Sequence, residues 1–246
     1  MAQTKENFTG YRFAGALYGR AFGSDDGWQR LGNVSELSTS TEVDKEELLS
    51  TAPADYGSAI SVYTKKSATN ITIVFNSFDR AAFARSLMGQ DSDIATTAAS
   101  FNKTVPAAVG VVELGVENID AESLTIQADG AALGENDIAY TLSAASGFLE
   151  ITSLNTTATE LEISGTNLAG GWTVAANSIT SFDFEFKMET ENLVSGKRGV
   201  LKIPHAVIAA EGGSNWIADD WVEKSFTGSI VKVEGLPEFS YTEFGA

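Results

Sequence analysis

Apolar and polar residues alternate with a period of two through most of this 246-residue chain. Such alternation predicts β-strands that bury one face, and the runs are bounded by Gly, Asn or Asp, which favour turns. The predicted strands span residues 58–63, 68–75, 124–127, 140–142, 148–151, 160–163, 181–188 and 225–233. Lys65 and Lys66 fall near the expected turn between the first two strands. The pattern therefore predicts an all-β fold of many strands.

One segment, residues 77–89, breaks this period. Ser77 is a capping-type residue, Asp79 stands in the first turn, and Gly89 suits the left-handed position after a helix. Its larger apolar residues form one stripe, so we predict an amphipathic helix that packs on the sheet. The fold class is thus mainly β with one packed α-helix.

The acidic segment 41–49 has two interpretations. Thr41 and Asp44 have the spacing of a capping box, which favours a second short helix, whereas the charge density suits an exposed loop equally well. Residues 89–103 have few large apolar side chains and are predicted to be a flexible connector. We therefore expect a single domain over residues 1–246 with a soft internal boundary near 90–104.

Charge is distributed unevenly along the chain. The chain carries 33 acidic and 16 basic residues, a formal net charge of −17, and no Lys or Arg occurs from Thr104 to Phe182. Residues 104–182 are therefore a candidate acidic β insertion or subdomain. Its carboxylates are either a solvated surface or a surface that repels a polyanion, and the overall acidity argues against affinity for a phosphate backbone.

Several chemistries are excluded by composition. The absence of cysteine excludes disulfides, thiolate nucleophiles and cysteine-ligated metals, and a single histidine, His205, excludes a two-histidine metal site within the chain. The adjacent pairs Asp25–Asp26 and Asp219–Asp220 are typical of turns, and no glycine-rich nucleotide motif is present. We therefore expect no enzyme, no catalytic residue, no cofactor and no metal. An enzyme would need a site built around His205 or a carboxylate pair.

Four tryptophans leave one binding function open. Trp28, Trp172, Trp216 and Trp221 are either core and interface anchors or sugar-stacking platforms, with Trp216 and Trp221 as the best pair. The second interpretation predicts a carbohydrate-binding or adhesion β-sandwich module.

Targeting signals are absent from the sequence. No apolar stretch approaches the roughly 20 residues of a membrane-spanning helix, and residues 1–6 contain no apolar core of a signal peptide. We therefore expect a protein that is made in a cytoplasm and has no membrane partner.

The order of these features resembles that of the tail tube (major tail) proteins of long-tailed, siphovirus-type bacteriophages. The resemblance covers most of the chain. The segments that carry it are Leu31 to Ser38, the acidic residues 41–49, the strands 60–63 and 71–75 that lead into the helix, residues 111–119 and 124–127, residues 135–142 followed by 147–151, and the closing segments 182–190, 197–204 and 221–233.

The resemblance implies a structural subunit of a virion tail. Its fold would be a tail-tube β-sandwich or barrel that forms hexameric rings with a continuous inner β-barrel, stacked into a conduit for DNA ejection. Double-stranded DNA would pass through without specific binding, because an acidic lumen repels phosphate. The protein would be assembled in the bacterial host cytoplasm, with itself and the tape measure, tail terminator and distal tail proteins as partners. A tube protein of a contractile tail or secretion apparatus would share the architecture.

Two sets of charged residues are candidate sites under this resemblance. The candidate lumen or surface acidic residues are Glu113, Glu117, Asp120, Glu122, Asp129, Glu150, Glu160 and Glu162. The candidate inter-subunit contacts are Glu42, Asp44, Glu46 and Glu47 against Lys65, Lys66, Arg80 and Arg85. The second set pairs an acidic with a basic region, which suits contacts between neighbouring subunits or rings, although both regions suit a solvated surface equally well.

Overall fold

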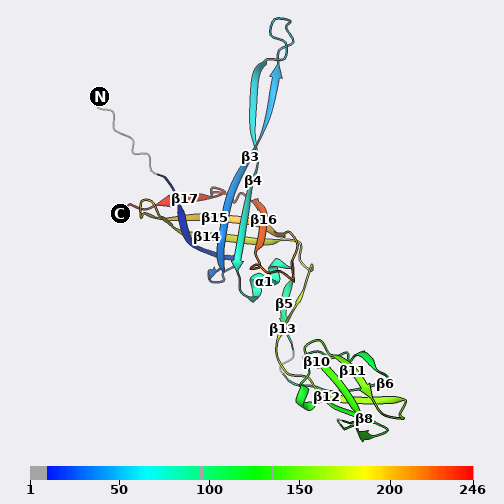
Figure 1. Ribbon diagram of the computed structural model, residues 1–246. Coiled ribbons are helices and arrows are strands. Elements are labelled where there is room, and N and C mark those ends of the chain that lie inside the picture. The colour runs from blue at the N-terminus through cyan, green and yellow to red at the C-terminus, as the bar shows by residue number, and fades with distance from the viewer. Residues whose placement is uncertain (1–9, 95–96, 135, 246) are drawn as a thin grey trace. The chain divides into compact units, whose positions relative to one another are not determined.

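A computed structural model describes residues 10–94, 97–134 and 136–245 of the protein. The chain divides into two compact units: unit 1 comprises Met1–Asp91 and Val174–Ala246, and unit 2 comprises Ser92–Thr173. Both consist mainly of antiparallel strands (Figure 1). Strands β5 (Gln90–Asp93) and β13 (Trp172–Ala175) pair where the chain enters and leaves unit 2. Unit 2 is therefore an insertion between two paired strands.

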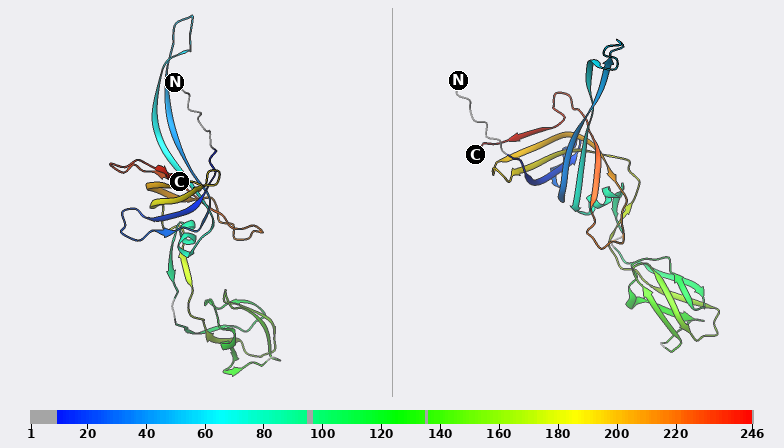
Figure 2. Two further views of the ribbon diagram at one scale, coloured as in Figure 1. Left: turned by 90° about the vertical axis from the view of Figure 1, so that its left-hand side faces the viewer. Right: turned by 45° about the horizontal axis from the view of Figure 1, so that its top comes forward.

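Unit 1 is built on one eight-stranded sheet. Its described elements are β1 (Phe13–Ala21), β2 (Gln29–Arg30), β3 (Asn33–Leu49), β4 (Ala59–Ser77), α1 (Arg80–Ser86), β14 (Phe182–Asn192), β15 (Arg198–Glu211), β16 (Lys224–Ile230) and β17 (Ser240–Glu243). The strand order is β2-β1-β14-β15-β16-β4-β3, and β17 also pairs with β15. The sheet is curved (Figure 2), and one of its faces holds one apolar cluster drawn from five strands. The fully buried members include Leu17, Ile71, Ile73 and Ile203.

The hairpin β3–β4 extends beyond the rest of the sheet (Figures 1 and 2). Strand β16 pairs with β4 only from Asn70 to Phe75, so residues 41–67, which we call the arm, form a two-stranded ribbon and its connecting loop. The predicted helix or loop at 41–49 is therefore wrong, because this segment is the end of a 17-residue strand. The turn predicted at Lys65 and Lys66 is also wrong, because β4 continues through both residues.

Cross-strand pairing explains why the arm is extended. Asp44 lies directly opposite Lys65, and Glu47 lies opposite Val62, so the charges of β3 face partners that tolerate or neutralise them. The turn instead falls at residues 50–58, where Gly57 has a φ of +84°. Sequence spacing typical of a helix cap was overridden by a β-prone partner strand.

Helix α1 is shorter than predicted. Ser77 still belongs to β4, and the cap is Asp79, whose side chain accepts a hydrogen bond of 2.7 Å from the backbone N–H of Ala82. Met88, with φ of +51°, takes the left-handed position expected for Gly89. Gly89 has a different role, because a Cβ there would lie 2.4 Å from the carbonyl oxygen of Ala175. A packed helix is confirmed, but its ends are set by the sheet around it.

Unit 2 has two small sheets around its own core. Its described elements are β6 (Ser100–Pro106), β7 (Gly110–Glu113), η1 (Ala121–Ser123), β8 (Thr125–Ala128), β9 (Ala131–Ala132), β10 (Ile138–Ser143), β11 (Phe148–Leu154) and β12 (Glu160–Thr166). The sheet orders are β10-β11-β7 and β6-β12-β8-β9. Leu149, Ile151, Leu161 and Ile163 are completely buried between them. The expected flexible connector 89–103 is wrong in part, since it contains β5 and the start of β6.

The mainly β fold is confirmed. The strands predicted at 124–127, 140–142, 148–151, 160–163, 181–188 and 225–233 correspond to β8, β10, β11, β12, β14 and β16, and their bounds differ by at most four residues. The described strands of one chain form no closed barrel. The sequence indicates an acidic insertion at residues 104–182. In the structure, the corresponding compact unit runs from Ser92 to Thr173.

Candidate functional site

A continuous polar face covers the side of strands β16, β4 and β3 that points away from the apolar core. Three rows of directly paired residues run across these strands: Ser229–Asn70–Ser40, Thr227–Thr72–Ser38 and Ser225–Val74–Glu36. We call these nine residues the hydroxyl face. Seven of the nine carry a hydroxyl or an amide, and none carries a positive charge. Residues of opposite parity on the same strands, such as Ile71 and Ile73, point into the core.

Hydrogen bonds fix several side chains of the hydroxyl face. The amide of Asn70 donates to Glu42 over 2.7 Å, and the hydroxyl of Ser38 donates to Glu36 over 3.2 Å. Strand β15 extends the face with Val207, Ala209 and Glu211, which pair with Ser229, Thr227 and Ser225. The face as a whole is therefore neutral to acidic.

Strand β3 forms one edge of the sheet. Along its 17 residues it pairs with β4 on one side, and no described strand pairs with its other side. Long exposed edges attract further strands, and proteins usually cover or interrupt them. The edge next to the hydroxyl face is thus able to accept a strand from another molecule.

The arm exposes many apolar side chains. Val43, Leu48, Leu49, Tyr56, Ile60, Val62 and Tyr63 are all between 48% and 78% exposed. At its base, the ammonium of Lys66 forms an ion pair with Glu238, and Thr69 donates to the same carboxylate over 2.6 Å. These two hydrogen bonds lower the pKa of Glu238 below its ordinary value. The base of the arm is therefore fixed, and its apolar end is open.

The structure separates the predicted inter-subunit residues into two groups. Glu42, Asp44, Glu46, Glu47, Lys65 and Lys66 lie on the arm, with Asp44 opposite Lys65 in the same chain. Arg80 and Arg85 lie on α1, where Arg80 pairs with Asp91 over 2.6 Å. The guanidinium of Arg85 stacks 5.2 Å from the ring centre of Phe184, and burial lowers its pKa. Arg85 thus packs on the core of its own unit.

The predicted lumen residues all lie in unit 2, so none belongs to the eight-stranded sheet. Glu113, Glu150, Glu160 and Glu162 are exposed on strands. Asp120 caps η1, and Asp129 has a φ of +53° in the Asp-Gly turn between β8 and β9. These positions show that two of the eight carboxylates have local structural roles. Glu135, in the same acidic stretch, lies outside the described residues.

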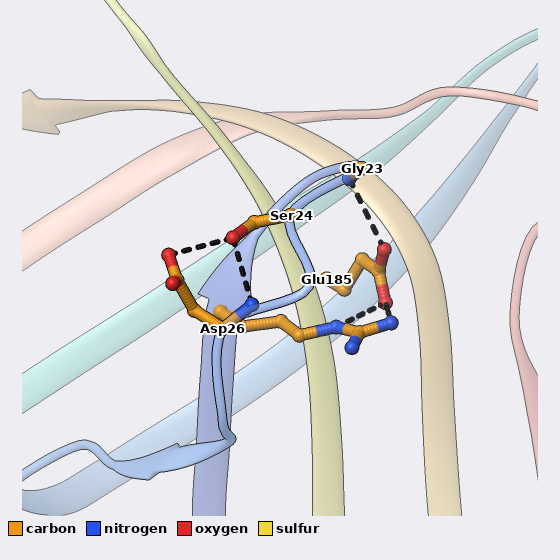
Figure 3. Close-up of polar contacts among 5 residues, drawn as sticks. Gly23, Ser24, Asp26 and Glu185 are labelled. Atoms are coloured by element: carbon orange, nitrogen blue, oxygen red, sulfur yellow. Dashed lines mark hydrogen bonds and ion pairs between the residues drawn. The ribbon is translucent and has the colours of Figure 1, made fainter.

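Two polar clusters lie at the β1–β2 turn and on the neighbouring strands. Glu185 binds Arg20 over 2.8 Å and accepts a hydrogen bond from the backbone of Gly23, while Ser24 and Asp26 bond each other in the same turn (Figure 3). Asp26 is thus a turn residue, as predicted. His205 has a carboxylate partner, with Nε2 lying 2.8 Å from Asp183, and its ring stacks on Phe22 at 3.8 Å.

The tryptophans predicted as a pair lie in the loop between β15 and β16. Trp216 is 72% exposed and Trp221 is 91% exposed. Trp216 packs edge-on against Phe83 of α1, with ring centres 6.2 Å apart. The two indoles therefore present aromatic surface to solvent, and Trp216 also anchors the loop.

Metal sites and membrane helices were sought in the part of the chain that the structure describes. No group of three His, Asp or Glu side chains there is arranged to hold a metal ion. None of the helices in that part is long and apolar enough to cross a membrane.

Comparison with known proteins identifies a family. Residues 10–237 match the family described as "Protein of unknown function UCP028589". The chain belongs to this family. No curated protein matches the chain. The family match spans both units, so the insertion of unit 2 into unit 1 falls within it.

The hydroxyl face was missed from the sequence. Its signal is present as Ser, Thr or Asn at every second position in 38–40, 70–72 and 225–229. Only the register between β16, β4 and β3, which the sequence does not contain, joins these short patterns into one surface.

Proposed function

We propose that this protein is the subunit of a phage tail tube, in which copies join into rings and the rings stack around a channel for DNA. The observation that carries the proposal is the hydroxyl face: nine residues without a cation, next to a free 17-residue edge strand. No sequence motif is needed for this argument, which rests on surface chemistry and strand topology.

The chemistry of the hydroxyl face suits a conduit for DNA. A phosphate backbone binds surfaces that release its counterions through Lys or Arg, and the hydroxyl face has neither. Glu36 and Glu211 add negative charge at one end of the face, which repels a polyanion. Short hydroxyl side chains also leave the surface smooth. DNA would pass over such a surface without being held.

Under this proposal, unit 1 and not unit 2 lines the lumen. The eight carboxylates first considered for the lumen lie in unit 2, outside the sheet whose edge is free. We therefore place the wall of the tube in unit 1, with unit 2 as an acidic domain added to each subunit. Eleven acidic residues against Lys103 alone keep unit 2 soluble and unable to bind DNA.

Ring closure follows from the edge strand. If β3 pairs with a different edge of the next copy, the contact is heterologous, and such contacts close into rings when the rotation between copies permits. The outer side of β2, the N-terminal half of β1 and the outer side of β17 are further edges of the eight-stranded sheet that pair with no described strand. A continuous inner barrel would form in this way from open sheets. The ring number of six remains an expectation from the resemblance.

The arm supplies a second contact between copies. A two-stranded ribbon is marginally stable by itself, and seven exposed apolar side chains raise the cost of leaving it in water. We infer that the arm packs against a neighbouring copy in the same or the adjacent ring.

Electron microscopy of the purified protein over a concentration series tests the proposal. We expect rings or tubes with an open centre in the wild type, and no stacked tubes for the folded arm variant Leu48→Glu/Ile60→Glu. The matched control is Val111→Glu, which changes a side chain that is 66% exposed on β7 of unit 2, and it should assemble normally. A wild type that stays monomeric at all concentrations, alone and with preformed tail tips, would refute the proposal.

A carbohydrate-binding module is the second candidate function. It is favoured by the exposure of Trp216 and Trp221, 72% and 91%, in one loop. Titration of intrinsic tryptophan fluorescence with a glycan panel tests it. A saturable change that is lost in Trp221→Ala would support this function, and an unchanged signal across the panel would exclude it.

A further inference from the structure

Three cations lie in one row across four neighbouring strands of unit 1. Arg30 on β2 pairs with Tyr18 on β1, Tyr18 pairs with Lys187 on β14, and Lys187 pairs with Lys202 on β15. We call these four residues the basic row. Arg30, Lys187 and Lys202 are exposed. None of the three forms an ion pair with any other residue that the structure describes.

The basic row is costly for a single copy. Lys187 and Lys202 are directly opposite each other, and like charges in this position destabilise a sheet. Glu185, which lies two residues before Lys187 on β14, is already bound to Arg20 over 2.8 Å. Glu189, which lies two residues after Lys187 on β14, is opposite the uncharged Val200. In a chain with a net charge of −17, two adjacent unpaired lysines point to a partner outside the sheet.

A cavity of about 270 Å³ lies beside the row. It is lined by Trp28, Glu185, Lys187, Lys202 and Pro204, among others. Trp28 is 41% exposed and lies under the guanidinium of Arg20, 5.0 Å from its ring centre. A partly exposed indole beside charged side chains is typical of protein contact sites. The basic row therefore borders a cavity in addition to carrying positive charge.

Unit 2 carries a complementary surface. Glu160 and Glu162 are exposed on the outward face of β12, at the centre of a four-stranded sheet. Their cross-strand neighbours are Pro106, Thr104 and Gln127, none of which is charged. The single basic residue of unit 2, Lys103, pairs with the inward-facing Ile163 and donates to the backbone carbonyl of Glu113. The glutamates of β12 thus also lack a cation.

We propose that the basic row binds the β12 face of unit 2 in a second copy of this chain. Two adjacent lysines then meet two glutamates spaced two residues apart, and each pair neutralises a charge that is unpaired in one copy. Because each copy carries both surfaces, the contact runs head to tail and extends from copy to copy. The contact requires only two copies and does not depend on a tube.

Cysteine cross-linking of the full-length protein tests the contact directly, because the chain contains no cysteine of its own. The Lys202→Cys variant is mixed with the Glu162→Cys variant and oxidised, and covalent dimers are measured on a non-reducing gel. The matched control replaces Lys202→Cys by Ser38→Cys, an exposed position on the hydroxyl face. We expect at least roughly tenfold more dimer in the test mixture than in the control. Equal yields would overturn the proposal.

Two further measurements separate the alternatives. A double variant Lys202→Cys/Glu162→Cys that links internally without forming dimers would show contact within one copy and overturn the proposal. For a charge-reversal test, the cysteines are moved to positions 30 and 104. The substitutions Lys187→Glu/Lys202→Glu in one copy should then lower the dimer yield roughly tenfold. Glu160→Lys/Glu162→Lys in the partner copy should restore the yield. Tubes without this cross-link would overturn the inference alone, and the cross-link without tubes would overturn the proposed function alone.

Discussion

Thr72→Lys places a positive charge at the centre of the hydroxyl face, between Ser38 and Thr227. The nine residues of the wild-type hydroxyl face include no cation, so this part of the sheet should show little affinity for DNA. In a ring, the substitution adds one lysine per copy to the surface that we assign to the lumen. The long side chain extends from an exposed sheet face, so the fold should tolerate it within about 0.5 kcal/mol.

The expected effect follows from counterion release. Each phosphate neutralised adds about 0.9 to the slope of log K against log salt. If three lysines of a ring contact phosphates, the slope increases by about 2.7, and DNA affinity should fall about fortyfold between 50 and 200 mM salt. The assay is retention of linear double-stranded DNA by purified tubes over this salt range.

A matched control distinguishes the lumen from the remaining surface. Thr125→Lys adds the same charge at an exposed position on β8 of unit 2, outside the eight-stranded sheet. Its tubes should bind DNA ends and threaded DNA no better than the wild type. The reasoning is refuted if Thr72→Lys and Thr125→Lys give the same salt slope, or if wild-type tubes already retain DNA.

Three further predictions concern stability. Ile163→Ala, at a completely buried position of unit 2, should cost about 2–5 kcal/mol and lower only one of two calorimetric transitions, because the units have separate cores; a single shifted transition would contradict this. Asp79→Ala should destabilise unit 1 by about 1 kcal/mol in urea unfolding, since it removes the cap on Ala82, whereas Asp25→Ala, at an exposed turn position of the same unit, should change it by less than about 0.5 kcal/mol. Glu238→Gln should lower the melting temperature at pH 7. Because the folded pKa of Glu238 is lowered, its contribution is present above the unfolded pKa of about 4.3 and is lost as pH falls through the folded value, so the two proteins should converge once the pH lies below the folded pKa; a constant difference would exclude this linkage.

Four strands of unit 2, β8, β10, β11 and β12, could be predicted because their signals are local. Leu161 and Ile163 alternate with Glu160 and Glu162, and the Asp129–Gly130 pair is a direct hairpin signal. Such patterns need no knowledge of the partner strand. The same holds for α1, whose apolar stripe predicted its existence but not its ends.

The arm and the hydroxyl face required information that one strand does not carry. Residues 41–49 are too charged to indicate a strand by themselves, and Lys65 and Lys66 interrupt the apolar pattern of β4. Once β3 and β4 are paired, Asp44 faces Lys65 and both anomalies disappear. Likewise, Thr72 gains a meaning only when Ser38 and Thr227 lie beside it. Register, and not propensity, decides both features.

Three surfaces of unit 1 lack a partner in one copy, and their physical chemistry separates them. The apolar arm gains from burial, which salts such as sulfate strengthen. The basic row gains from Coulomb attraction, which is screened beyond about 8 Å at 0.15 M salt. The β3 edge gains from backbone hydrogen bonds, which depend little on salt. Rising salt should therefore release the contact between the basic row of one copy and the β12 face of a second copy, while the β3-edge and arm contacts persist. At high salt, a tube would then keep its width and repeat but lose the cross-link between positions 202 and 162. That result would assign each surface to its own contact.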